Sequence, residues 1–358
     1  MTPDPLVLQA FRDPECVRHF SLVDWDLALR QAGSGKLVAS LAMVLEDSGL
    51  LPTLPQQARA HLAWSLTQAE RHGQAVRWEV AQIRAALADC GVPFILLKGA
   101  AYHMAQLPAA RGRLFSDIDI LVPKADLDQV EAALMMHGWI STHHDAYDQR
   151  YYREWMHELP PMQHVRRESL IDVHHAILPE TSAARPDPEK LRAAALPLGA
   201  LAGVSVFSPH DLVLHSAVHL FYDGELDHGM RDLIDIDRLL RHYAGAPGFW
   251  DALAARAVEL EVGRPLFYAL RYVSQMLGSP IPAAALAASA AAAPPAMLLG
   301  LMDRLFGRAL LPAHASCDDA WTACARFLLY LRANWLRMPP LMLARHLFHK
   351  AFLSPKPE

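Results

Sequence analysis

The chain has 358 residues, of which 53% are hydrophobic and 20% charged, so it can bury a substantial core and is not an intrinsically disordered chain. A net charge of −5 provides no overall basic field that would attract nucleic acid. The four cysteines (Cys16, Cys90, Cys317 and Cys324) form no Cys-x-x-Cys pair. Their spacing argues against a disulfide framework or a cysteine-based zinc site and favours isolated thiols in a reducing cytoplasm.

Residues 1–90 are expected to form an N-terminal helical region. The first residues lack the basic and apolar segments of a signal peptide. Apolar residues recur at helical spacing from Leu27 to Leu45, and a second helix is expected from Gln56 to Asp89, with Gly73 able to interrupt it. The sequence Gly-x-Gly-Lys ending at Lys36 lacks the other residues of a phosphate loop, so a loop between helices is the preferred interpretation.

Residues 91–178 have the pattern of an α/β core with a mixed sheet. Short apolar segments alternate with one amphipathic helix after another, and they then give way to segments rich in β-branched and aromatic residues. A turn at residues 167–169 predicts that the last two strands pair as a hairpin. The expected strands are Phe94–Leu97, Leu114–Val122, Trp139–His143, Tyr151–Leu159, Met162–Arg166 and Leu170–His175, and the expected helices are Gly99–Leu107 and a segment from Pro123 to about Gly138.

The remaining chain is predicted to be a connector followed by helices. Residues 179–207 hold four prolines, which indicates a connector, and residues 208–358 are expected to form a C-terminal helical domain. Ser208-Pro209-His-Asp211 has the residues of a helix start. Prolines break the alanine-rich stretch Ile281–Met302, which is therefore a poor membrane span. The predicted fold class is α+β, a small mixed sheet flanked by N-terminal and C-terminal helical regions.

Three aspartates stand in segments that are otherwise apolar. Asp117 and Asp119 lie two apart on one predicted strand, so their side chains point to the same face. Aspartate is unfavourable in strands, and two neighbouring carboxylates repel each other unless a cation lies between them. Mg²⁺ binds through such carboxylates together with substrate phosphates. If the strand that holds Asp172 lies beside this one, Asp172 would be a third metal ligand or a general base.

The residues around the first aspartates could bind phosphate. The Lys98-Gly99 turn precedes a predicted helix, where backbone N–H groups favour anions, and Arg111 and Arg113 could pair with phosphate oxygens. Each feature alone has an ordinary explanation as a turn, a surface charge or a strand end. Because the turn, the arginines and the aspartate-bearing strands follow one another in one part of the chain, together they favour a common site.

Several histidines and one further aspartate are candidates for an acceptor pocket. His174 shares a strand face with Asp172, although a buried structural histidine is an equal alternative. His215 and His219 lie one helical turn apart, a spacing that also suits zinc, but packing or a position facing the cleft is preferred. Asp232 could line the pocket or belong to a solvated helix face.

At these residues the chain resembles the nucleotidyltransferase superfamily, which has the fold of DNA polymerase beta and the aminoglycoside nucleotidyltransferases. The motifs Leu97-Lys-Gly-Ala-Ala101, Ser116-Asp-Ile-Asp-Ile-Leu-Val122 and Ile171-Asp-Val-His174 are most similar to the uncharacterised nucleotidyltransferase family. The resemblance covers about residues 85–245.

The resemblance implies Mg²⁺-dependent or Mn²⁺-dependent transfer of a nucleoside monophosphate, AMP from ATP by preference, to a hydroxyl with release of pyrophosphate. Asp117, Asp119 and Asp172 would hold the metal and be catalytic, and Lys98, Gly99, Arg113 and Ser116 would bind the nucleotide. The acceptor, a hydroxylated small molecule or a protein, is left open. Ala100 stands where the superfamily often has Gly or Ser, so a nucleotide-binding regulatory module without turnover is the alternative, and a structural partner of another enzyme is a third.

Overall fold

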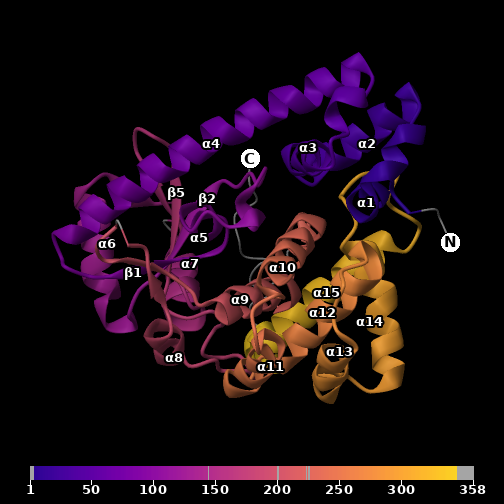
Figure 1. The fold of residues 1–358 in the computed structure, drawn as a ribbon. Coiled ribbons are helices and arrows are strands. Elements are labelled where there is room, and N and C mark those ends of the chain that lie inside the picture. Colours follow the sequence, from indigo (N-terminus) through magenta and orange to yellow (C-terminus); the bar gives the residue numbers. More distant parts are fainter. Residues whose placement is uncertain (1–3, 144, 200, 223, 225, 345–358) are drawn as a thin grey trace.

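The computed structural model describes residues 4–143, 145–199, 201–222, 224 and 226–344. A seven-stranded mixed sheet is surrounded by helices from both ends of the chain (Figure 1). The strands are β1 (Phe94–Leu96), β2 (Asp117–Leu121), β3 (Trp139–Ser141), β4 (Met162–His164), β5 (Leu170–His174), β6 (Leu196–Pro197) and β7 (Val204–Val206). The helices are α1 (Leu6–Arg12), α2 (Leu22–Ser34), α3 (Val38–Asp47), α4 (Gln56–Ala88), α5 (Lys98–Met104), α6 (Leu127–Met136), α7 (Ala146–Arg150), α8 (Pro188–Ala193), α9 (Pro209–Tyr222), α10 (Gly229–Tyr243), α11 (Phe249–Glu259), α12 (Gly263–Leu277), α13 (Ala283–Ser289), α14 (Ala296–Ala309) and α15 (Thr322–Arg337).

Neighbouring residues in the sequence explain how the N-terminal helices begin and continue. Ser21 and Asp24 form a reciprocal capping box at the start of α2, with N–O distances of 3.2 and 2.9 Å. Helix α4 is one uninterrupted element of 33 residues that runs from the N-terminal helices to α6 (Figure 1). The helix continues through Gly73. The missing side chain at this position leaves room for the His103 ring, since an added Cβ would lie 2.5 Å from its Cε1 atom. The expected interruption near Gly73 is therefore wrong.

The sheet has the strand order β3-β4-β5-β2-β1-β7-β6. β2 lies between antiparallel β1 and parallel β5, and the register sets Asp119 beside Asp172. Ile118 and Ile120 point to the opposite face, where they are buried. β4 and β5 pair in antiparallel fashion, which confirms the predicted hairpin. The mixed sheet and the α+β class are likewise confirmed.

One predicted strand is wrong. The chain from Tyr151 to Trp155 forms a turn of π-helix, and of the segment up to Leu159 only Glu158 bridges to the sheet, opposite His174. Aromatic residues favour strands in general, but here the rings of Tyr151 and Trp155 pack edge to face with centroids 6.2 Å apart. Their i, i+4 spacing brings them together only on a helix.

The stretch 179–207, expected to be a connector, also contributes to the sheet. It contains α8, β6 and β7, and β7 pairs in parallel with β1, placing Phe94 opposite Val204. Helix α9 then begins after Ser208, whose Oγ accepts a hydrogen bond from the Asp211 N–H at 3.3 Å, which confirms the predicted helix start. The expected boundaries at residues 90, 178 and 207 stay predictions.

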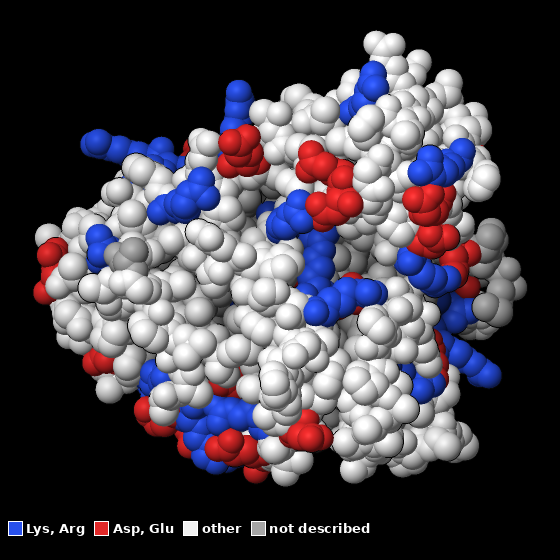
Figure 2. Space-filling model, in the orientation of Figure 1, with Lys and Arg blue, Asp and Glu red and all other residues white. Residues whose placement is uncertain are grey.

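The helices and the sheet share one continuous apolar core. It extends from Leu41 of α3 through Ile120 of β2 to Leu233 of α10 and Phe306 of α14. Within the described residues, no helix alone has the length and apolar character needed to cross a bilayer; α13 with the turn after it and α14 reach that length only jointly, across a bend of 110°. On the face shown in Figure 2, Lys and Arg are interspersed with Asp and Glu and form no continuous basic surface. All four cysteines are free thiols.

Candidate active site

Three carboxylates converge on one face of the sheet. One oxygen each from Asp117, Asp119 and Asp172 can be chosen so that all three lie within 4.8 Å of one another. No hydrogen bond to the half-buried Asp172 carboxylate is found among the described residues. Burial, and then repulsion from Asp119, raises the pKa of Asp172 to about 8. The cluster therefore requires a proton or a cation, and its all-oxygen donor set suits Mg²⁺ or Mn²⁺.

Asp119 is held in place by hydrogen bonds from two side chains. Its Oδ1 accepts hydrogen bonds from Nζ of Lys98 at 2.9 Å and from Nε2 of His174 at 3.0 Å. Burial opposes ionisation, but the Lys98 charge and the His174 hydrogen bond outweigh it and hold the pKa of Asp119 well below its usual range. Lys98 adopts a φ of +45°, an unusual conformation for a residue with a side chain, at the point where β1 leads into α5.

Gly99 is needed because other groups approach it closely. It is buried, and an added Cβ would lie 2.6 Å from Cδ1 of Phe115 and would also collide with the Arg113 guanidinium. Helix α5, which begins at this turn, has only seven residues. The glycine thus lets the segment before β2 pack against α5, beside Lys98 and Ser116, which line the same cavity.

Two cavities meet at the carboxylates. The larger has a volume of about 330 Å³ and the smaller about 270 Å³, and both are lined by Lys98, Asp117, Asp119 and His219. Aromatic and imidazole side chains dominate the larger cavity, whereas cationic side chains and carboxylates, Asp227 among them, line the smaller one in equal number. The larger cavity is also lined by Asp172, Tyr151, Tyr152, Tyr222, Tyr330 and Arg337, and the smaller by Lys36, Arg113, Ser116, His228, Arg231 and Asp232.

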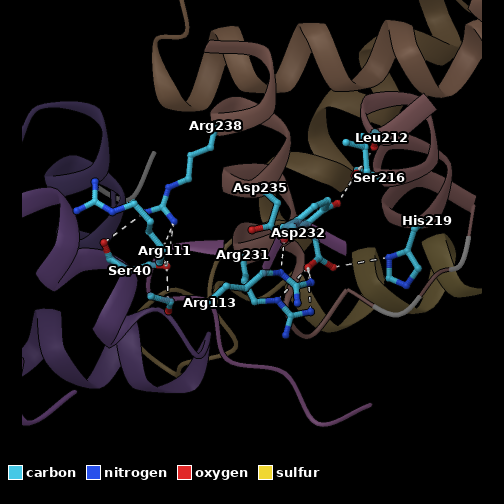
Figure 3. Close-up of polar contacts among 12 residues, drawn as sticks. Ser40, Arg111, Arg113, Leu212, Ser216, His219, Arg231, Asp232, Asp235 and Arg238 are labelled. Carbon is cyan, nitrogen blue, oxygen red and sulfur yellow. Dashed lines mark hydrogen bonds and ion pairs between the residues drawn. The ribbon is translucent and has the colours of Figure 1, made fainter. Parts of the chain in front are cut away.

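A buried ionic network forms one wall of the smaller cavity. Figure 3 shows Arg113 and Arg231 reaching toward Asp232 and Asp235 of α10. Nε of Arg113 donates to Asp235 at 2.5 Å, and the guanidinium of Arg231 lies 2.8 Å from Asp232. The Arg113 guanidinium thus forms ion pairs with the carboxylates of Asp232 and Asp235. Arg111 pairs with Asp47 at 2.5 and 2.9 Å on the surface, so the structure does not bring it to the site.

The candidate acceptor residues fall on different sides of the carboxylates. His174 and His215 line the larger cavity, and His219 lines both. Asp232 lines only the smaller one, and its Oδ2 lies 3.8 Å from Nδ1 of His219. His215 packs edge-on against Phe207, and burial holds its pKa well below the ordinary value. Among the described residues, the groups of ligand atoms close enough to share a metal do not include His215 or His219.

Sequence reasoning missed several residues that line the two cavities. Glu158 and His157 lie in the segment Tyr151–Leu159, for which the sequence predicts a strand, and neighbouring residues of a strand are expected to point to opposite faces. Lys36, dismissed with the incomplete phosphate-loop motif, lies in the turn between α2 and α3 and lines the smaller cavity. The signal available in the sequence is its place at the end of the Gly-x-Gly-Lys motif, directly after Gly35.

Comparison with known proteins supports the resemblance seen in the sequence. The family model described as "Uncharacterised nucleotidyltransferase" matches residues 21–278, which is most of the chain and includes the whole sheet. No curated protein and no solved structure matches the chain. With the carboxylates on adjacent parallel strands, the match establishes that the chain belongs to the uncharacterised nucleotidyltransferase family.

Proposed function

We propose that the protein transfers AMP from ATP to a hydroxyl group of a small molecule or a protein, with release of pyrophosphate. The observation that carries the proposal is the parallel register of β2 and β5, which sets Asp172 directly beside Asp119 on the face that also holds Asp117. These three carboxylates would hold Mg²⁺ or Mn²⁺. When bound, the metal would neutralise charge on the phosphates and orient them for in-line displacement.

The two cavities offer separate places for donor and acceptor. The smaller one presents Lys36 and the Lys98-Gly99 turn, which would pair with the polyphosphate of the donor. It is also lined by Arg231, which pairs with Asp232, and by the carboxylate of Asp227. The larger one lies on the Asp172 side of the site and is walled by tyrosines that can stack on a ring. An acceptor hydroxyl there would be next to Asp172, which would take its proton or align it through the metal.

The second candidate, a nucleotide-binding module without turnover, is favoured by one specific observation. Lys98 and His174 both donate to Asp119, so this carboxylate is already compensated by groups of the protein. A site that had lost its metal would need such compensation. Asp172 argues for the enzyme, because the described residues supply no donor to it.

Calorimetry and product analysis separate the two. ATP is titrated with and without MgCl₂ into the wild type, Asp117→Asn and Asp119→Asn, with Asp251→Asn on the exposed face of α11 as the matched control. We expect Mg²⁺-dependent binding in the wild type and the control and its loss in the site variants. Labelled ATP with a panel of hydroxylated acceptors then tests for transfer and for pyrophosphate.

Each outcome is decisive. Absence of Mg²⁺-dependent ATP binding in the wild type would refute the enzyme. ATP binding that does not require Mg²⁺, or binding without pyrophosphate release across the panel, would favour the module, and absence of any ATP binding would refute both candidates. The cytoplasmic location expected from the sequence stays a prediction, to be checked by fractionation.

A further inference from the structure

We propose that His157, Glu158 and His174 form a second metal site, for Zn²⁺ or another divalent transition metal, next to the carboxylate cluster. The proposal does not rest on nucleotidyl transfer: it concerns different ligands and a different class of metal. It rests on the geometry of the three side chains, on the way the backbone holds them, and on the hydrogen bond behind His174.

The ligand atoms are already close together. One ligand atom from each of the three residues can be chosen so that all lie within 4.8 Å of one another. Nδ1 of His174 lies 3.2 Å from Oε2 of Glu158. Bonds of about 2.0–2.2 Å to a tetrahedral zinc would separate neighbouring ligand atoms by roughly 3.3 Å. A metal ion at this point therefore replaces the direct contact between these two atoms with little change in their separation.

The backbone fixes the two segments that carry the ligands. Glu158 and His174 are paired in an isolated antiparallel bridge. On either side of it, the Leu159 N–H donates to the Val173 carbonyl and the His175 N–H donates to the His157 carbonyl, both at 2.8 Å. The ligands thus come from a strand of the central sheet and a segment hydrogen-bonded to that strand, as expected of a preorganised site.

The hydrogen bond behind His174 matches the way metal-binding histidines are usually held. Its Nε2 lies 3.0 Å from Oδ1 of Asp119. A carboxylate that accepts the Nε2 proton fixes the tautomer in which Nδ1 presents a lone pair to a metal. Asp119 would therefore orient the ligand of one site while it contributes to the other.

The donor set separates this site from the carboxylate cluster. Two imidazoles and one carboxylate suit Zn²⁺ and related transition metals, whereas three carboxylates suit Mg²⁺ or Mn²⁺. His157, Glu158 and His174 all line the larger cavity of about 330 Å³. The fourth coordination position is therefore open toward that cavity, where water or an oxygen or nitrogen of a bound molecule can occupy it.

The test uses the metals alone as probes. Chelator-treated full-length protein is dialysed against ZnCl₂ and its metal content measured, and CoCl₂ titrations follow the visible spectrum, in which tetrahedral imidazole coordination absorbs far more strongly than octahedral oxygen coordination. The variants are His157→Ala and the nearly isosteric Glu158→Gln. His61→Ala, at an exposed position of α4, is the matched control, and Asp117→Asn disables the carboxylate cluster.

We expect the wild type, His61→Ala and Asp117→Asn to give the strong cobalt spectrum, and Glu158→Gln and His157→Ala to bind at least about ten-fold more weakly. Circular dichroism shows whether each variant is folded, and Glu158→Gln alone decides the matter if His157→Ala is not. A weak, octahedral spectrum in the wild type, or cobalt binding lost in Asp117→Asn but retained in Glu158→Gln, would overturn the proposal.

Discussion

Replacement of Arg113 by methionine distinguishes a structural role for this residue from the phosphate-binding role that the sequence suggests. The Arg113 and Asp235 side chains are each only 5% exposed, and their contact is 2.5 Å long. The guanidinium also lies over the Tyr102 and Phe115 rings, at 5.7 and 5.4 Å from their centroids. Methionine keeps much of the volume but leaves Asp235 buried without its partner.

Loss of one partner of a buried ion pair destabilises a protein by about 3–5 kcal/mol, and we expect a loss in this range for Arg113→Met. Asp235→Asn should cost a similar amount. The double variant should be less destabilised than the sum, with a coupling of about 0.5–3 kcal/mol, because neither charge is then left alone. The free energy of unfolding is measured by urea titration followed by circular dichroism, with ATP binding in parallel. If Arg113→Met lost ATP binding while its stability stayed within about 0.5 kcal/mol of the wild type, the structural assignment would be refuted and Arg113 would be a phosphate ligand.

Three further substitutions test the packing around the site. Gly99→Ala should destabilise by about 1–3 kcal/mol because the new methyl group collides with the Phe115 ring, and chemical denaturation would show it; a neutral result would mean that α5 shifts freely. Tyr102→Phe removes a buried hydroxyl 2.5 Å from Oγ of Ser216 and should cost about 0.5–1.5 kcal/mol by the same assay, whereas a gain in stability would contradict that hydrogen bond. Burial, followed by the nearby His103, Arg113 and Lys36 side chains, lowers the pKa of His72 to about 4. As the pH falls, the unfolded chain therefore binds this proton before the folded protein does, so the stability contributed by the neutral His72 is present above pH 6.5 and is lost as the pH falls toward 4. In thermal melts, the melting temperature of His72→Leu should therefore fall less steeply than that of the wild type over this pH range. An equally steep fall in the two proteins would refute the assignment.

Local patterns predicted the elements that carry the carboxylates. Alternation around Asp117 and Asp119, the turn before Leu170 and the Ser208 helix start each involve neighbours in the sequence, so the residues themselves specify them. The approach of Asp172 to Asp119 was harder to predict because it depends on which strands pair. It followed from the resemblance, and the register confirms it.

The parts that sequence reasoning missed depend on contacts between distant segments. A helix that continues through Gly73 depends on where the His103 ring packs, and the partner of Arg113 lies 122 residues away on α10. The segment at Tyr151–Trp155 carries strand-forming residues but forms a helical turn, and Tyr151 and Tyr152 pack against a cluster that includes Met338 and Leu343 from the other end of the chain. Contacts between segments far apart in the sequence, which local patterns do not report, accompany each of these features.

The carboxylate cluster and the lining of the larger cavity depend on different parts of the chain. Between β3 and β4 the chain leaves the sheet after Ser141 and returns to it at Met162. The excursion between them contributes Tyr151, Tyr152 and Glu158 to the larger cavity, while hydrogen bonds between β2 and β5 hold the carboxylates regardless of its length. Loops of this kind accept insertions and substitutions at low thermodynamic cost. The excursion can therefore be exchanged between relatives, by evolution or by design, to reshape one cavity while the carboxylate cluster stays in register.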